Sequence, residues 1–167
     1  MLVLDVDGTL VDTREIRLRM ARGEVLRVAE EALTAPPIPF TLNLARQARE
    51  EGIEIVVLTA RGDDDRDLTV MLLERLGVTY DKLLTQPAGL VRLDLVWKRE
   101  AAKALLADRS GDSVLAIDDS PYIVDMWEQL SVPVIQIPGW AFGYVGSLEP
   151  ELPEELPWTL NLSQIRQ

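Results

Sequence analysis

The 167-residue sequence contains no cysteine and no histidine. Without cysteine it forms no disulfide, supplies no thiol nucleophile and binds no metal through thiolates. Without histidine, Ser-His-Asp triads, imidazole acid–base catalysis and His-ligated zinc sites are all excluded. Any acid–base or covalent chemistry must therefore fall to carboxylates, lysine or hydroxyl groups. A metal ion would need oxygen ligands, which favours Mg²⁺, with Mn²⁺ or Ca²⁺ as substitutes.

Long apolar runs and an excess of basic residues are also missing. No stretch approaches the ~20 apolar residues that span a bilayer. No signal peptide precedes the first strand-like segment, so we expect a cytoplasmic protein with no membrane partner. The net charge is −11, whereas extended nucleic-acid binders usually carry a basic surface. A long polynucleotide groove is therefore not expected, although the phosphates of one strand end could still be held.

Short apolar runs alternate with segments of helical periodicity along most of the chain. The apolar runs predict strands at residues 2–6, 53–59, 82–85, 114–118 and 134–137. Apolar spacing and end signals predict helices at residues 14–33, 41–51, 67–76, 93–107 and 122–130. This alternation is typical of an α/β fold, with a mostly parallel, Rossmann-like sheet and helices on both faces.

The length fits a single domain with a substantial core. We expect that core to span residues 1–140, with residues 141–167 as a tail packed on the core or extending from it. Two helices and a proline-rich connector account for the ~45 residues between Asp7 and the second predicted strand. The fold should therefore have little or no cap domain, and its site should be open to a bulky substrate.

Two acidic pairs stand at the ends of predicted strands. Asp5 and Asp7 follow the first apolar run, and Asp118 and Asp119 follow the fourth. Ligands bind at the carboxyl ends of strands in such sheets, so both pairs are expected at the same edge. Carboxylates gathered in one place repel one another unless a cation lies among them. The pattern therefore predicts a metal-dependent carboxylate site.

Taken in order, these residues resemble the motifs of the haloacid dehalogenase (HAD) superfamily of phosphotransferases. The first motif, DxDGT followed by a hydrophobic residue, matches residues 5–10. The threonine or serine of the second motif matches Thr59, the lysine of the third matches Lys98, and the acidic pair of the fourth matches residues 118–119. The resemblance covers about residues 1–140 and implies a HAD-type fold with Mg²⁺ as cofactor.

A closer likeness is to the 3′-phosphatase domain of phage-type polynucleotide kinase-phosphatases. Their R-x-D-x-V-x-K run matches residues 92–98, and their AIDD motif with its Val-acidic-Met-Trp helix matches segments within residues 116–127. Their second motif ends in Gly-Arg, of which Arg61 keeps the arginine. The likeness implies an enzyme of nucleic-acid repair that removes 3′-phosphates from polynucleotide ends.

The resemblance also implies a role for each acid. Asp5 would be the nucleophile that forms an aspartyl-phosphate, and Asp7 would protonate the leaving oxygen and then activate water. Mg²⁺ would be held by Asp5, the backbone carbonyl of Asp7 and Asp118. Asp119 would be a further ligand or a neighbour of the ligands.

The remaining matched residues would bind or support the phosphoryl group. Thr59 and Lys98 would bind its oxygens, and Arg61 is either a further substrate contact or a surface residue. Lys98 would also counter the charge of the nucleophile, and Asp94, one helical turn earlier, would hold it as an i,i+4 pair. Arg92 is interpreted as either a supporting residue or a surface residue.

Other residues near these motifs have plainer interpretations. The acids at 63–65 precede a helix and should favour its N-terminal dipole. Arg14 and Arg17 begin the first predicted helix, close to the site, and are expected to be solvated. Trp97 and Trp127 are expected in the core rather than as platforms for base stacking.

Three functions remain open on the sequence. The first is a Mg²⁺-dependent phosphomonoester hydrolase acting on polynucleotide 3′-phosphates, and the second is a phosphatase of mononucleotides or other small phosphate esters, which the acidic charge favours. The third is a catalytically idle scaffold, against which the intact acids and Lys98 argue. No GxxxxGK[ST] phosphate loop of a kinase is present, so a separate kinase or ligase partner is expected if the enzyme does not act alone.

Overall fold

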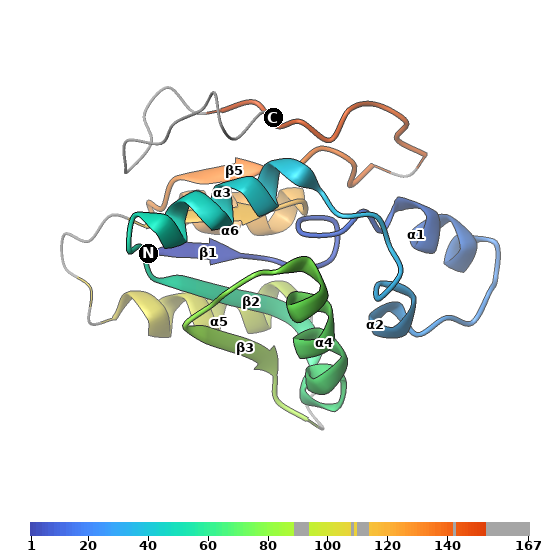
Figure 1. The fold of residues 1–167 in the computed structure, drawn as a ribbon, viewed down its shortest axis with the longest axis horizontal. Coiled ribbons are helices and arrows are strands. Elements are labelled where there is room, and N and C mark those ends of the chain that lie inside the picture. Colours follow the sequence, from blue (N-terminus) through green and yellow to red (C-terminus); the bar gives the residue numbers. More distant parts are fainter. Residues whose placement is uncertain (89–93, 108, 110–113, 142, 153–167) are drawn as a thin grey trace.

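The computed structural model describes residues 1–88, 94–107, 109, 114–141 and 143–152. Within them, five strands form one sheet: β1 (Leu2–Leu4), β2 (Ile55–Gly62), β3 (Lys82–Gln86), β4 (Leu115–Asp118) and β5 (Val134–Gln136). Their order is β3-β2-β1-β4-β5 and every pairing is parallel (Figure 1). The strand order reverses at β1, which lies between β2 and β4, and ligands bind at such switch points.

Helices cover both faces of the sheet, as the sequence predicts. In Figure 1, α3 (Pro39–Glu50) and α4 (Arg66–Leu76) lie in front of it, and α5 (Asp94–Leu106) and α6 (Pro121–Gln129) lie behind. Successive strand residues point to opposite faces, so Leu2 and Leu4 pack in the cluster with α3 and α4. Val3 packs in the second cluster, with α5 and α6. Burial on both faces explains why the strands are continuous apolar runs.

The ends of these four helices follow local signals in the sequence. Pro39 and Pro121 stand in the first turns of α3 and α6, where the missing N–H has no intrahelical partner to lose. Ser120 is the N-cap residue of α6, and Gly77 ends α4 in the left-handed conformation with a φ of 68°. The predicted boundaries of all four helices agree with the structure to within two residues.

The continuous helix predicted over residues 14–33 is wrong. The structure has two short helices there, α1 (Arg14–Ala21) and α2 (Val28–Glu31), separated by a turn in which Gly23 has a φ of 93°. A residue in that conformation cannot continue a right-handed helix. Arg19 then pairs with Glu24 in the turn and Glu31 in α2, at 2.9 and 2.6 Å.

The broken helix leaves α1 and α2 beyond the carboxyl ends of the strands (Figure 1). The turn between them is tied to the sheet, because Arg27 pairs with Asp65 at 2.5 Å. Asp65 ends a 3₁₀ turn, η1 (Asp63–Asp65), which leads into α4. The described excursion from β1 to α3 contains only these two short helices, so no cap domain is inserted between β1 and α3.

After β5 the described chain passes beside α1 (Figure 1). Leu148 and Leu152 are partly buried against the core cluster that includes α3 and α4. Much of the predicted tail of residues 141–167 lies outside the described residues. None of the helices in the described parts of the chain is long and apolar enough to cross a membrane.

Candidate active site

Three buried acids converge at the carboxyl edge of the sheet. Asp5 directly follows β1, Asp118 ends β4, and Asp119 is the next residue. Since β1 and β4 are neighbours, the N–H of Asp5 donates to the carbonyl of Ile117 at 3.0 Å. One carboxylate oxygen from each acid lies within 4.8 Å of the others. The fold thus brings residues of both acidic pairs together.

Lys98 on α5 lies between two of these acids. Its Nζ donates to Oδ1 of Asp5 at 2.7 Å and to Oδ2 of Asp118 at 2.6 Å, and the residue is 4% exposed. Burial opposes the charge on Lys98, but attraction from Asp118 and Asp5 outweighs it and raises the pKa of the ammonium group. Lys98 therefore stays protonated and orients two carboxylates from different strands.

The charges of the cluster do not balance. Burial raises the pKa of Asp5 well above its ordinary value despite Lys98. Burial and Asp118 also raise the pKa of Asp119 to about 6, although Arg17 opposes the shift. These shifts show that ionising all three acids is unfavourable: three carboxylates would then face two cations in a desolvated site, an excess of negative charge that a divalent cation would offset. The all-oxygen donor set suits Mg²⁺, so the residues present fit such an ion.

Gly8 lets Asp119 approach the loop that follows β1. Its φ of 86° is a conformation that L side chains rarely adopt. A Cβ at Gly8 would also overlap the carboxylate of Asp119. The glycine of the DxDGT motif therefore serves both the turn and the cluster of acids.

Asp7 lies at the rim of the buried cluster, and its side chain is 26% exposed. Arg61, near the end of β2, holds it with two parallel hydrogen bonds: Nε donates to Oδ2 and Nη2 to Oδ1, both at 2.7 Å. The other terminal nitrogen of Arg61 donates to the hydroxyl of Thr69 on α4 at 3.3 Å. A fork of this kind fixes the plane of the carboxylate as well as its position.

Thr59 is buried within β2 and joins the site to α5. Its hydroxyl accepts from the backbone N–H of Arg61 at 3.2 Å, and its carbonyl accepts from Nε1 of Trp97 at 3.0 Å. Trp97 is partly buried on the helix that carries Lys98, so this contact sets the distance between β2 and that helix. Trp127 is a core residue, 2% exposed.

Of the two residues predicted to support the site, Asp94 and Arg92, the structure describes only Asp94. Asp94 is exposed at the first residue of α5. Among the described residues, the hydrogen bonds of the Lys98 ammonium go to Asp5 and Asp118 rather than to Asp94. Arg92 lies outside the described residues.

Arg17 belongs to this edge, although the sequence interpretation left it solvated. Its Nη1 donates to Oδ2 of Asp119 at 3.0 Å and its Nη2 to the carbonyl of Gly139 at 2.9 Å. Arg14, one turn earlier, pairs instead with Asp12 at 2.7 Å. The available signal was a helix with arginines three residues apart, starting soon after the first acidic pair. Their partners depended on the break after α1, which the periodicity did not indicate.

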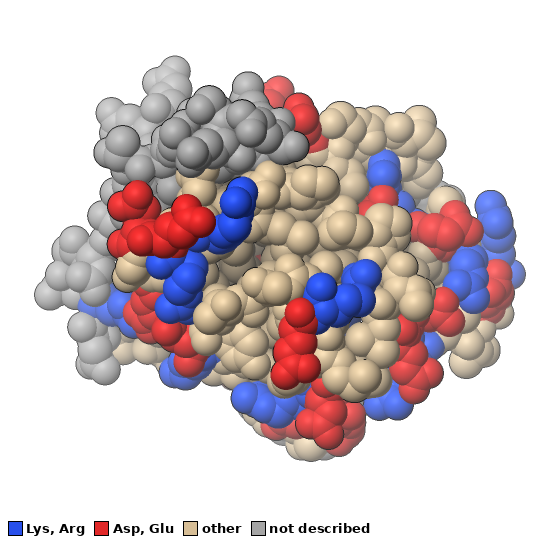
Figure 2. All heavy atoms as spheres, viewed as in Figure 1, with Lys and Arg blue, Asp and Glu red and all other residues tan. Residues whose placement is uncertain are grey.

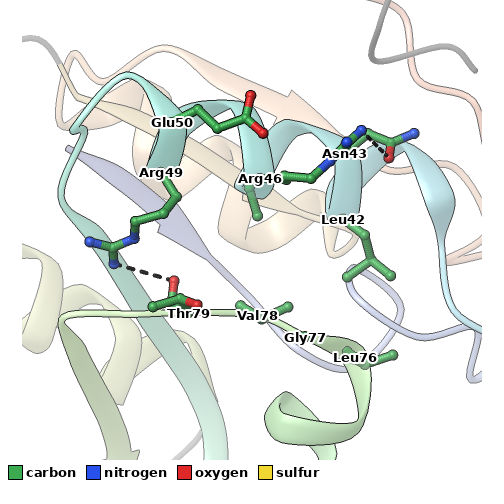
Figure 3. Close-up of a pocket in the computed structure, with 10 residues that line it drawn as sticks. Leu42, Asn43, Arg46, Arg49, Glu50, Leu76, Gly77, Val78 and Thr79 are labelled. Atoms are coloured by element: carbon green, nitrogen blue, oxygen red, sulfur yellow. Dashed lines mark hydrogen bonds between the residues drawn. The ribbon is translucent and has the colours of Figure 1, made fainter.

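A separate groove of about 330 Å³ lies between α3 and the turn after α4 (Figure 3). Arg49 crosses part of it and donates to the carbonyl of Thr79 at 3.3 Å. The turn leads into β3, so the groove lies toward the amino ends of the strands, away from the acids. Its lining includes Leu42, Leu76, Val78, Arg46 and Arg49 and none of the residues of the acidic cluster.

A family model described as the polynucleotide kinase PNKP phosphatase domain matches residues 1–142 of the chain. The match includes every residue of the candidate site. No curated protein matches the chain in the corresponding comparison.

Solved structures with similar folds come from several kinds of enzyme. A chain of the Pnkp1/Rnl/Hen1 complex is 24% identical, with a TM-score of 0.67 over 82% of this chain and 45% of that one. The class C acid phosphatase from Bacillus anthracis with tungstate bound is 18% identical, with a TM-score of 0.59 over 83% and 66%. An L-2-haloacid dehalogenase is 16% identical, with a TM-score of 0.55 over 90% of each chain.

These structural likenesses concern the fold, because every identity is below 25%. The chain spans less than half the length of the Pnkp1/Rnl/Hen1 chain that it matches. Phosphatases and a dehalogenase thus share this fold, so the fold alone does not identify the reaction. The reaction must be inferred from the side chains at the carboxyl edge of the sheet.

Proposed function

Because this chain belongs to the family of polynucleotide kinase PNKP phosphatase domains and is a phosphatase of the haloacid dehalogenase type, we propose that it removes 3′-phosphates from polynucleotide ends. The observation that carries the proposal is the position of Asp7, an acid at the rim of the buried cluster and oriented by Arg61. An alkoxide is a poor leaving group, so an acid beside the nucleophile that can protonate it, and later activate water, favours phosphomonoester hydrolysis.

In the first step an oxygen of Asp5 attacks phosphorus. Oδ2 is the freer oxygen, since Oδ1 accepts from Lys98 at 2.7 Å while Oδ2 accepts from the hydroxyl of Thr9 at 3.4 Å. As the bond from Asp5 to phosphorus forms, the bond from phosphorus to the 3′-oxygen breaks. For this step Asp7 must leave the fork of Arg61 and take up a proton from solvent. It then gives that proton to the leaving oxygen and becomes a carboxylate again.

In the second step the aspartyl-phosphate is hydrolysed. Asp7, now ionised, takes a proton from a water molecule whose oxygen attacks phosphorus. The bond from phosphorus to Asp5 breaks, phosphate leaves, and both acids return to their starting states. For these transfers an oxygen of Asp7 must be available, and the incoming phosphoryl group would compete for the guanidinium of Arg61.

Asp5, Asp118 and Asp119, with the backbone carbonyl of Asp7, are proposed to hold Mg²⁺, which would offset charge on the phosphoryl oxygens. Lys98 keeps two of these carboxylates oriented and, with Thr59, is proposed to bind the phosphoryl group. If the acids hold the ion, Mg²⁺ should raise the melting temperature of the protein without any substrate. Asp118→Asn should abolish that shift. An equal shift in the variant would contradict the assignment.

The choice of a polynucleotide end rests on the family and on the open site. A matching solved chain is part of a Pnkp1/Rnl/Hen1 RNA repair complex, which also suggests a separate ligase or kinase partner for this chain. Among the described residues no cap domain lies between β1 and α3, which favours an open site that a strand end can enter. The net charge of −11 and the mixed acidic and basic side chains on the face in Figure 2 favour a single strand end over a long duplex.

The same acidic charge favours a second candidate, a phosphatase of mononucleotides or other small phosphate esters. The deciding experiment measures Mg²⁺-dependent phosphate release from a short oligonucleotide with a 3′-phosphate, its 5′-phosphate twin and a panel of nucleotides. Preference for the 3′-phosphate end is the expected result. Preference for mononucleotides would replace the proposal with the second candidate.

A further inference from the structure

The segment after β5 is fastened to α1 by two arginines. Arg17 donates to the carbonyl of Gly139 at 2.9 Å. Arg14 donates to the carbonyls of Tyr144 and Gly146 at 3.4 and 3.1 Å. These contacts hold the backbone of the segment against the helix that reaches the acidic cluster. The segment therefore forms part of the wall of the site rather than a loose end.

Trp140 is an aromatic residue of this segment that packs against Arg17. The guanidinium carbon of Arg17 lies 5.3 Å from the centre of its ring, while the same guanidinium binds Asp119 at 3.0 Å. The indole is thus one guanidinium group away from an acid of the cluster. It remains 40% exposed, and it lines a small cavity of about 60 Å³ together with Arg17 and Tyr144.

The contact with Arg17 orients the indole ring of Trp140, so that its exposed part can stack on another flat group. A cation against an aromatic ring is an attractive contact that limits how the ring can turn. Arg17 is itself held by Asp119 and by the carbonyl of Gly139, so the support does not move freely. An exposed aromatic ring that is held in one orientation offers a face on which another flat group can stack.

We propose that Trp140 stacks on the base of the terminal nucleotide and thereby determines preference for a nucleoside 3′-phosphate end. This inference rests on the proposed function. With the phosphoryl group at Asp5 and Lys98, the sugar and base of the same nucleotide must lie outside the buried cluster, and the indole lies outside it beside the Arg17 that binds Asp119. Stacking accepts any base, because every base has a π-face, and it needs no basic groove. It would give an acidic protein a hold on nucleic acid that its charge does not provide.

The test compares two substrates in Mg²⁺: a short oligonucleotide with a 3′-phosphate, and the same oligonucleotide whose terminal sugar lacks its base. Trp140→Ala should lower kcat/KM on the first by roughly 10- to 100-fold, mainly through KM, and leave the second within about twofold. Trp140→Phe, which keeps an aromatic face, should retain most of the activity on both. Equal loss on both substrates, or loss on neither, would overturn the inference.

Binding gives a second readout that does not depend on turnover. In an Asp5→Asn background, the oligonucleotide with its terminal base should quench tryptophan fluorescence, and the additional change Trp140→Phe should remove most of the quenching. Unchanged quenching would contradict stacking at Trp140. The proposed function fails separately, if the wild-type enzyme does not prefer the 3′-phosphate end over its 5′ twin.

Discussion

The two edges of the sheet carry ion pairs in very different surroundings. At the carboxyl edge, Lys98 is buried between Asp5 and Asp118, and all three side chains are at most 7% exposed. At the amino edge, beside the groove in Figure 3, Arg49 pairs with Asp81 at 2.9 Å while the two side chains are 35% and 42% exposed. Buried charges destabilise the fold unless they are paired, whereas exposed pairs contribute little either way. The comparison predicts that removing one partner of a pair is far more costly at the carboxyl edge than at the amino edge.

The glycines of the two edges also differ in what surrounds them. Gly8 and Gly77 both have positive φ, at 86° and 68°. A Cβ at Gly8 would overlap Asp119, whereas a Cβ at Gly77 would meet nothing within 4 Å. Gly77 is therefore required only by the backbone of a helix end. Gly8 is required by the backbone and by the acids.

The largest expected difference between the edges is in activity. Asp5→Asn removes the proposed nucleophile and should lower phosphate release from an aryl phosphate by roughly 10⁴-fold or more. The matched control is Asp81→Asn, the same change at the amino edge, which should leave the rate within about twofold. A similar loss in both variants would show that the rate responds to a general change in the fold.

The next largest effect is on stability. Lys98→Met leaves Asp5 and Asp118 buried without their cation and should lower the free energy of unfolding by about 3–5 kcal/mol in the presence of a chelator. Arg49→Met should lower it by less than about 1 kcal/mol. Urea unfolding of both variants at neutral pH makes the comparison.

The pH dependence of the Lys98→Met variant tests whether its loss of stability comes from unpaired buried charge. Burial already raises the pKa of Asp5, and losing the lysine removes the main influence that lowers it, so the folded variant takes up a proton more readily than the unfolded chain. Stability should then recover as the pH falls below neutral. A penalty that does not change with pH would point to lost packing instead.

A smaller effect is expected from replacing the two glycines, and it distinguishes backbone strain from a steric clash with Asp119. Gly8→Ala and Gly77→Ala should each lower the melting temperature, because alanine disfavours a positive φ by roughly 1–2 kcal/mol. Only Gly8→Ala should also displace Asp119 and lower kcat, by roughly 10- to 100-fold. Equal activity of the two variants would mean that Asp119 moves aside without consequence.

The smallest effect is the pH dependence of the exposed pair. Hydrogen bonds from Arg49 and from the backbone N–H of Ile55 lower the pKa of Asp81. A carboxyl whose pKa is lowered by folding stabilises the protein above its unfolded pKa and loses that contribution as the pH falls through the folded value. Wild type and Asp81→Asn should therefore differ by less than about 1 kcal/mol at neutral pH and converge toward about pH 3. Urea unfolding of both proteins across this pH range is the measurement. A difference that persists in acid would contradict the prediction.

Most of the fold could be predicted because its signals are local. Apolar runs end at Asp5 and Asp118, and Pro39, Pro121 and Gly77 mark helix ends, so the strand and helix positions follow from short stretches of chain. The helix over residues 14–33 was predicted wrongly because its apolar spacing continues through Gly23, where the backbone turns. A single glycine in such a pattern does not by itself indicate a break.

The candidate site also has a part that could be predicted from local sequence and a part that could not. That Asp5 and Asp118 lie at the same edge of the sheet follows from the sequence, since each stands at the end of a predicted parallel strand. That they meet depends on β1 and β4 being neighbours, which the structure shows. The partners of Arg61 and Arg17 could not be predicted. Arg61 holds Asp7 across 54 positions of the chain, and Arg17 holds Asp119 across 102. Nothing in either local pattern distinguishes these arginines from solvated ones.

The sequence by itself determined the parallel sheet, the edge at which the acids gather and the oxygen-only chemistry available there. These properties depend on which residue types are present and on their spacing along one strand or helix. Only the tertiary structure decided that Arg17 joins Asp119 to Gly139 and that Trp140 lies beside them. The physical reason is that such contacts unite distant segments, whose distances are set by how α1 and the chain after β5 pack on the finished sheet.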